Sequence, residues 1–154
     1  MDGPRFRRIA VAVDGSSSAE RAVAVAVDLA KTYGADLLVV AVAPLPAVFT
    51  APNQPLVPTA IPENTLPRYR ELVDATVRGA RAAGVKNVRG ACLEGVIVDE
   101  VLAQVRGQGS DLLVVGSRGL STVQRLMLGS VSSALVTHAP CPVLVVRPVS
   151  PPSK

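Results

Sequence analysis

Five apolar runs alternate with stretches of helical character along the 154 residues, and this alternation is the strongest constraint on the fold. The runs span residues 6–13, 35–43, 88–93, 111–115 and 143–146, and the one at 88–93 is the weakest. Consecutive rather than alternate positions are apolar, which is typical of strands covered on both faces. The sequence therefore predicts a single α/β domain built on a doubly wound parallel sheet.

Helical patterns fill the intervals between these runs. Val98, Val101, Leu102 and Val105 follow the i, i+3, i+4, i+7 spacing of one buried helix face. A helix closing near Gly34 is predicted to open with a capping box from Ser17 to Glu20. Two further helices are predicted, one over residues 62–83 and one from about residue 130 to just before Pro140.

The chain shows no sign of a second folding unit. We expect one domain over residues 1–149, followed by a tail at 150–154. Residues 44–62 contain six prolines and little regular pattern, which predicts a long loop. This loop is either a lid over a site or a surface insert without a role, and the sequence leaves both readings open.

Composition argues against several classes of partner. Aromatic residues make up 3% of the chain, and the basic residues behind the net charge of +4 are scattered, so we expect no nucleic-acid partner. No apolar run approaches the roughly 20 residues of a membrane span, and the N-terminus lacks a signal-peptide pattern. We expect a cytoplasmic protein without membrane contact, whose Cys92 and Cys141 are reduced.

The most informative segment follows the fourth apolar run directly and leads into the last predicted helix. Its glycines have the spacing G-x2-G-x9-G at Gly116, Gly119 and Gly129. Glycine lets a backbone approach a ligand closely, and a helix N-terminus offers free N–H groups to an anion. Arg118 adds positive charge, while Ser130 and Ser132 add hydroxyl donors. The segment predicts a phosphate or ribose site, and a glycine-rich connector without a ligand is the alternative.

Asp14 ends the first apolar run, at the edge where open α/β sheets bind ligands. Its carboxylate could accept hydrogen bonds from ribose hydroxyls or help to hold a divalent cation. The alternative is a local Asx turn or a helix cap. No P-loop or GxGxxG pattern is present, and the only histidine, His138, lies near a helix end. The sequence therefore indicates binding rather than catalysis, and no catalytic residue is predicted.

At these residues the chain resembles the universal stress protein family, of the nucleotide-binding type. The resemblance covers nearly the whole chain and rests on IAVAVDGSSSAERAV at its start, SDLLVVGSRGLS in its middle and LGSVSSALVTHAPCPVLVV at its end. The glycine signature, completed by Ser130, occurs together with Val13-Asp14 at the end of the first strand. The resemblance implies a Rossmann-like sheet of the adenine nucleotide alpha hydrolase type, with its strands in the order 3-2-1-4-5.

The resemblance also implies ATP as the ligand, with or without Mg²⁺ bound to it and with no metal site of the protein's own. The adenine would lie near Val42, the ribose near Asp14, and the phosphates along residues 129–132. The binding residues would be Ala12, Val13, Asp14, Val42, Val115, Gly116, Arg118, Gly119, Gly129, Ser130, Val131 and Ser132. Such a protein would act in stress adaptation or dormancy as a nucleotide sensor. A slow ATPase and a cyclic-AMP-binding signalling module remain as alternatives.

The fifth strand indicates self-association. Val143, Leu144, Val145 and Val146 are all apolar, and only a proline-rich tail follows them, so this strand is expected at an edge of the sheet. An apolar edge without a charge invites pairing with another strand. We therefore expect a homodimer that pairs through this strand across a two-fold axis, which the resemblance also implies. A monomer whose loop or tail covers the edge is the alternative.

Overall fold

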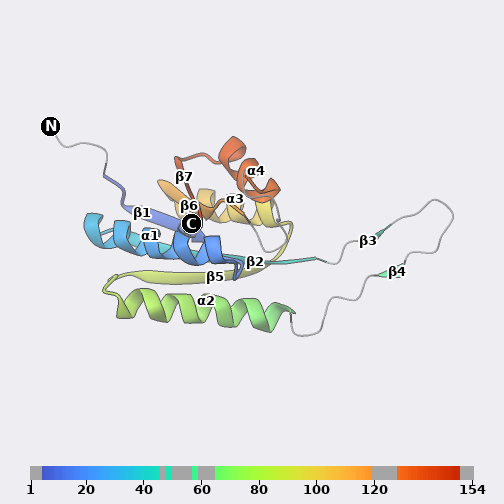
Figure 1. The fold of residues 1–154 in the computed structure, drawn as a ribbon, viewed down its shortest axis with the longest axis horizontal. Helices are drawn as coiled ribbons and strands as arrows, with labels where there is room; N and C mark the ends of the chain where they lie inside the picture. The colour runs from blue at the N-terminus through green and yellow to red at the C-terminus, as the bar shows by residue number, and fades with distance from the viewer. Residues whose placement is uncertain (1–4, 46–47, 50–56, 59–64, 119–127, 150–154) are drawn as a thin grey trace, which may run out of the picture.

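A five-stranded parallel sheet forms the centre of the protein (Figure 1), and its order in space is β5-β2-β1-β6-β7. The computed structural model describes residues 5–45, 48–49, 57–58, 65–118 and 128–149. The strands are β1 Arg8–Ala12, β2 Asp36–Pro44, β5 Val88–Gly95, β6 Leu112–Gly116 and β7 Val143–Val146. Counted along the chain, this order is the predicted 3-2-1-4-5, so both the fold class and the strand order are confirmed.

Within the described residues, four helices cover the two faces of this sheet. They are α1 Ser17–Tyr33, α2 Thr65–Ala82, α3 Ile97–Gln108 and α4 Ser130–His138. Side chains of α1 and α2 pack in one core cluster, and those of α3 and α4 pack in a second cluster on the opposite face. The predicted double winding is therefore present, and it explains why the strand sequences are apolar on both sides.

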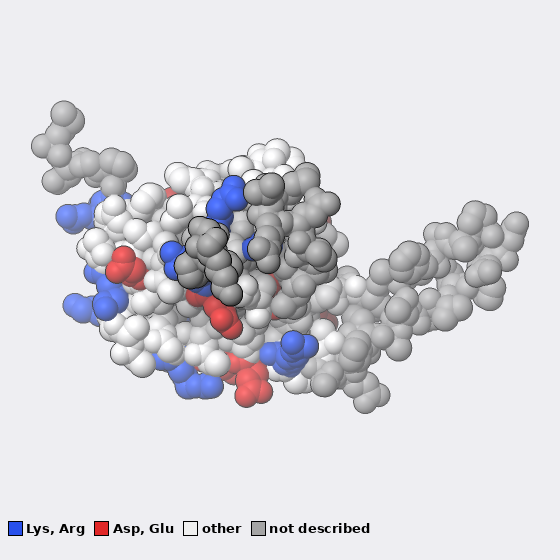
Figure 2. Space-filling view, viewed as in Figure 1, with Lys and Arg blue, Asp and Glu red and all other residues white. Residues whose placement is uncertain are grey.

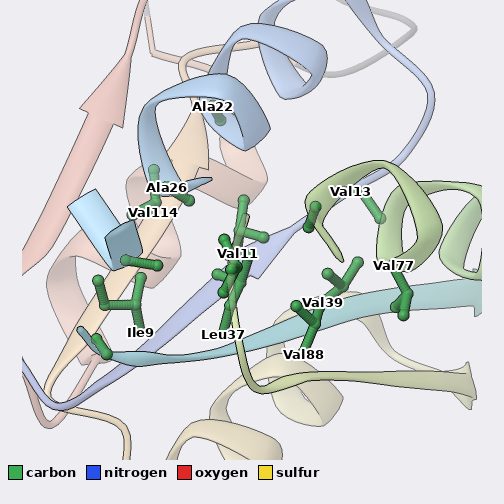
Figure 3. Packing of buried hydrophobic residues seen from close by; sticks show 14 of the residues in the cluster. Ile9, Val11, Val13, Ala22, Ala26, Leu37, Val39, Val77, Val88 and Val114 are labelled. Carbon is green, nitrogen blue, oxygen red and sulfur yellow. The ribbon is translucent and has the colours of Figure 1, made fainter. Parts of the chain in front are cut away.

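The alternation of side chains along β1 shows how one strand serves both cores. Ile9 and Val11 belong to the cluster under α1 and α2 (Figure 3), whereas Ala10 belongs to the cluster under α3 and α4. Small residues let the helices lie close to the sheet. Gly90 on β5 is one of them, because a Cβ atom there would collide with the side chain of Val73 on α2.

The start of α1 differs from the prediction by one residue. Ser16, not Ser17, is the N-cap: its backbone is extended, with φ −73° and ψ 159°, and its Oγ accepts the N–H of Ala19 at 3.3 Å. Ser17 is already helical, so Glu20 lies in the first turn and the predicted capping box is wrong by one position. The helix ends as predicted at Gly34, whose φ of 64° is in the left-handed region.

The proline-rich segment at 44–62 lies mostly outside the described residues. Within it, β3 Val48–Phe49 and β4 Val57–Pro58 form an antiparallel pair. Figure 1 shows this pair apart from the five-stranded sheet. The sequence did not predict these strands, because each has only two residues. Whether this loop is a lid or a surface insert therefore stays open, as the sequence left it. The domain boundary at residue 149 also stays a prediction.

Charged side chains of both signs are interspersed on the face drawn in Figure 2, which carries no continuous basic stripe over the described residues. Two of the N-terminal arginines instead have a local structural role through their backbones. The N–H groups of Arg7 and Arg8 donate to the two carboxylate oxygens of Asp111 at 2.9 and 3.1 Å, which fixes the start of β1 beside β6. Across the described ranges, no helix combines the length and apolar character needed to cross a membrane.

The two cysteines are both free, and they lie at opposite edges of the sheet, Cys92 on β5 and Cys141 just before β7. Four strand spacings of ~4.8 Å separate these edges by roughly 19 Å, whereas a disulfide requires Cα atoms within about 7 Å. Burial, the largest cause at both sites, raises the pKa of each thiol. A raised pKa leaves less thiolate at a given pH.

We therefore expect both thiols to react slowly with Ellman's reagent at pH 8 in the folded protein and rapidly in urea. Tryptic mapping of oxidised monomer should yield no peptide that links Cys92 to Cys141. Such a peptide would contradict the strand order, and thiols that react equally fast in native buffer and in urea would contradict their burial.

Candidate functional site

A cavity of about 250 Å³ opens at the carboxyl ends of the strands, where β1 and β6 lie side by side. Every predicted site residue that the structure describes lines this cavity, and Gly119 lies outside the described residues. The lining residues are Ala12, Val13, Asp14, Ala19, Val40, Val42, Tyr69, Ile97, Val101, Val115, Gly116, Arg118, Gly129, Ser130, Val131, Ser132 and Leu135. The fold thus brings together residues that are more than a hundred positions apart in the sequence, although their roles in binding stay a prediction.

Asp14 stands at one side of the cavity, two residues beyond the end of β1. Its Oδ1 accepts the backbone N–H of Ser16 at 2.9 Å, and this contact is the Asx turn that the sequence left open as an alternative. The turn and a binding role are compatible, because a carboxylate has lone pairs on two oxygens. The turn holds the carboxylate at the cavity wall.

The N-terminus of α4 forms another part of the wall. Gly129 is its N-cap, and no side chain caps this end through a hydrogen bond. The first bond of the helix runs from the N–H of Ser133 to the carbonyl of Gly129 at 2.9 Å. The N–H groups of residues 130–132 therefore precede the helical bonding pattern, and the helix dipole adds partial positive charge beside them. This arrangement suits an anion such as phosphate.

Hydrogen bonds hold the chain in place on both sides of the glycine-rich segment. Ser18 Oγ donates to the carbonyl of Arg118 at 2.6 Å, which ties the end of β6 to the first turn of α1. Ser132 Oγ donates to the carbonyl of Gly116 at 2.6 Å. A hydroxyl has one proton, so the Ser132 hydroxyl that we expected to face a ligand already donates within the protein. Its backbone N–H is the donor that Ser132 can direct to an anion.

Gly116 has a steric role in addition to its place at the cavity. A Cβ atom at this position would lie 2.5 Å from Ser18 Oγ, 2.8 Å from the Ser18 carbonyl carbon and 2.9 Å from the Ala19 nitrogen. Because two of these atoms are backbone, only glycine allows β6 to pass so close to α1. The sequence suggested close approach of a ligand here, whereas the structure shows close approach of a helix.

Most of the remaining wall is apolar, and most of it was not predicted from the sequence. Val40 and Val101 were predicted only as core residues and Leu135 only as part of the last helix, and nothing in their pattern marked them as exposed to a cavity. Ile97 starts α3 just beyond the end of β5, so the rule that ligands bind at carboxyl ends could have identified it. Tyr69 comes from α2, whose approach to Asp14 depends on tertiary packing and is not readable from spacing.

The described residues contain no group of three or more His, Cys, Asp or Glu side chains placed to hold a metal ion. His138, at the other end of α4 from the cavity, is not among the lining residues. Among the described lining residues, the polar side chains are those of Asp14, Tyr69, Arg118, Ser130 and Ser132. These residues offer a carboxylate as an acceptor, together with a guanidinium, hydroxyls and backbone N–H groups as donors.

Fold and cavity together define a doubly wound α/β protein whose site lies where this class of fold binds its ligands. Comparison with known proteins specifies the family. The sequence profile of the universal stress protein family matches residues 5–147. A protein of Thermus aquaticus named "Universal stress protein in QAH/OAS sulfhydrylase 3'region" is 40% identical over 144 residues, which cover 92% of this chain and 99% of that protein. The chain belongs to the universal stress protein family.

Solved structures agree with this assignment. Universal stress protein UspA from Lactobacillus plantarum superposes with a TM-score of 0.71 at 25% identity, covering 94% of this chain and all of that one. A universal stress protein crystallised in complex with cAMP superposes with a TM-score of 0.71 at 26% identity, covering 95% of this chain and all of that one. At least one structural relative therefore binds an adenine nucleotide.

Proposed function

We propose that this protein binds ATP in the cavity described above and acts in the cytoplasm as a nucleotide-responsive factor in stress adaptation or dormancy. One observation carries the proposal: Asp14 and the uncapped N-terminus of α4 border the same cavity. The first offers an acceptor for ribose hydroxyls, and the second offers N–H donors for phosphates. The apolar side chains of Val40 and Val42 line the same cavity and suit a purine.

The size and charge of the site support a nucleotide. A volume of about 250 Å³ is near the ~300 Å³ lower end of small-molecule sites, and it suits a nucleoside whose phosphates extend toward α4. Three successive N–H groups at residues 130–132 favour a polyphosphate over the single phosphodiester of cyclic AMP. Mg²⁺, where present, would arrive on the phosphates, since the described residues contain no cluster of ligands for it.

We also propose that turnover is absent or slow. Among the lining residues that the structure describes, Asp14 is the only carboxylate and none is a histidine, and Asp14 Oδ1 already accepts the N–H of Ser16. General-base catalysis needs a group poised near neutral pH at the reacting atoms. Phosphate release from ATP should therefore stay well below about 1 per second, the lower end of ordinary enzyme rates. A rate in the enzymatic range would favour the ATPase alternative.

Calorimetry with the purified, nucleotide-free protein tests the binding proposal. Heat release followed by chromatography first shows whether nucleotide is carried through purification. We then expect ATP to bind more tightly than GTP, and cyclic AMP to compete less well than ATP. Absence of any heat at millimolar ATP with folded protein would overturn the proposal, and tighter binding of cyclic AMP would replace ATP with the cyclic nucleotide.

Homodimerisation through β7 is a separate proposal about the same protein. β7 is one edge of the sheet, and none of its four residues is charged, whereas the other edge strand, β5, carries Arg89 and Glu94. Leu144 is 37% exposed, although Val143 and Val145 pack against the core under α3 and α4. Charge protects an edge strand from pairing, so β7 is the edge suited to a second copy.

We expect Leu144→Lys to shift the protein from dimer to monomer, because a charge would be buried at the pairing edge. Leu144 is a better position than Val145, whose replacement would also disturb the core. The matched control is Val96→Lys, at a 59% exposed position just beyond the opposite edge strand, which should leave the dimer intact. Light scattering after size exclusion gives the mass, and a wild-type mass near 15.9 kDa at tens of micromolar would refute the dimer.

A further inference from the structure

Two cavities meet at the ribose end of the proposed site. Beside the cavity already described, a second one of about 360 Å³ lies between the start of α1 and α2. It is lined by Asp14, Gly15, Glu20, Arg68, Tyr69, Glu71, Leu72 and Ala75. Among the described residues, Asp14 and Tyr69 line both cavities. These two residues therefore lie where the cavities adjoin.

Tyr69 differs from the rest of the lining residues in origin and in chemistry. It lies on α2, outside the segments that carry the family resemblance, and it is the only aromatic side chain among the described lining residues. Its ring packs against the core cluster under α1 and α2, together with Leu72. This packing restricts the ring, and Tyr69 is only partly exposed to solvent.

The phenolic hydroxyl is a hydrogen-bond donor at neutral pH. Burial is the largest cause that raises the pKa of Tyr69, and the Asp14 carboxylate is the second. The neighbouring Arg68 guanidinium acts in the opposite direction. A higher pKa means that the hydroxyl keeps its proton throughout the physiological range. The place where the cavities adjoin therefore combines a carboxylate, which can only accept, with a hydroxyl that can donate.

We propose that Tyr69 is a ribose-recognition residue, which together with Asp14 selects nucleotides that carry free ribose hydroxyls. This inference rests on the function proposed above. A ribose hydroxyl both donates and accepts, so a carboxylate alone satisfies only half of its capacity. Asp14 takes the proton of one hydroxyl, and the Tyr69 hydroxyl donates to the oxygen of the same or the adjacent one.

Removing the Tyr69 hydroxyl tests this assignment with little disturbance, because Tyr69→Phe keeps the ring and its packing. We expect Tyr69→Phe to bind ATP about three- to tenfold more weakly than the wild type, the usual effect of one lost hydrogen bond. One of the two analogues, 2′-deoxy-ATP or 3′-deoxy-ATP, lacks the hydroxyl that Tyr69 contacts. The wild type and Tyr69→Phe should bind that analogue with equal affinity. Tyr33→Phe is the matched control, since Tyr33 is 37% exposed and contacts Phe6 away from the cavity.

The outcomes separate this proposal from the one on which it rests. If the wild type binds ATP and Tyr69→Phe binds it equally well, the ribose role is overturned while ATP binding stands. If Tyr69→Phe weakens ATP and both deoxynucleotides by the same factor, Tyr69 contacts another part of the ligand, and the ribose role is again overturned. If the folded wild type binds none of the three nucleotides, the proposed function fails and this assignment fails with it. Thermal unfolding of each variant verifies that the fold is retained.

Discussion

Asp14→Asn is expected to lower the affinity for ATP about ten- to a hundredfold, the effect of losing a hydrogen bond to a charged group worth about 1.5–3 kcal/mol. The amide keeps an oxygen that can accept the Ser16 N–H, so the turn after β1 should persist. The substitution therefore removes the negative charge and half of the acceptor capacity without removing the local structure. Calorimetric titration with ATP measures the change.

A matched control is needed, because removing a negative charge also favours an anionic ligand through simple electrostatics. Asp28→Asn makes the same change in net charge at an exposed position on α1, far along the helix from its N-terminus. We expect this control to bind ATP as well as the wild type or slightly better. Equal affinities for Asp14→Asn and Asp28→Asn would show that Asp14 serves only the Asx turn.

Gly116→Ala is expected to destabilise the protein by about 1–3 kcal/mol, the usual cost of overpacking. The added methyl group would collide with the backbone of Ser18 and Ala19, which cannot move without shifting the start of α1. That shift would also disturb the bonds between Ser18 and Arg118 at the cavity, so ATP affinity should fall together with stability. Urea denaturation gives the free energy of unfolding.

Gly107→Ala on α3 serves as the control for this experiment, since no atom lies within 4 Å of a Cβ atom built there. Alanine favours a helix over glycine by up to ~1 kcal/mol, so Gly107→Ala should stabilise the protein. The two substitutions add the same methyl group and are expected to act in opposite directions. A Gly116→Ala variant as stable as the wild type would mean that α1 and β6 have more room than the structure shows.

The sequence alone predicted the fold well, because its strongest signals are local. Runs such as residues 35–43 are apolar at consecutive positions, and this pattern is typical of strands that are covered on both faces. The strand order came from the family resemblance and not from the pattern itself. Element ends were less accurate: β5 continues to Gly95 rather than ending at Leu93, since backbone pairing with β2 extends beyond the apolar side chains.

The site was predicted only where the chain carries a motif. Asp14 was identified because it follows a strand directly, and the glycines were identified by their spacing between a strand and a helix; the fold places the ends of β1 and β6 together. Tyr69 could not be identified in this way, because its place at the cavity depends on how α2 packs across the sheet. The contacts of Gly116 and Ser132 could not be predicted from the sequence either. Gly116 lies against Ser18 on α1, and the Ser132 hydroxyl donates to the carbonyl of Gly116, and only the folded structure brings these groups together.

Ser117, a buried residue, links two parts of the protein through its peptide groups alone. Its N–H donates to the carbonyl of Val146 at 2.8 Å, and its carbonyl accepts the N–H of Gly129 at 2.8 Å. The last residue of β7 and the N-cap of α4 are thus joined through a single residue. A displacement of α4, the helix proposed to bind the phosphates, would therefore reach the edge strand over two hydrogen bonds. The amide protons of Ser117 and Gly129 should in consequence exchange with solvent together, and they would report nucleotide occupancy and edge pairing in one measurement.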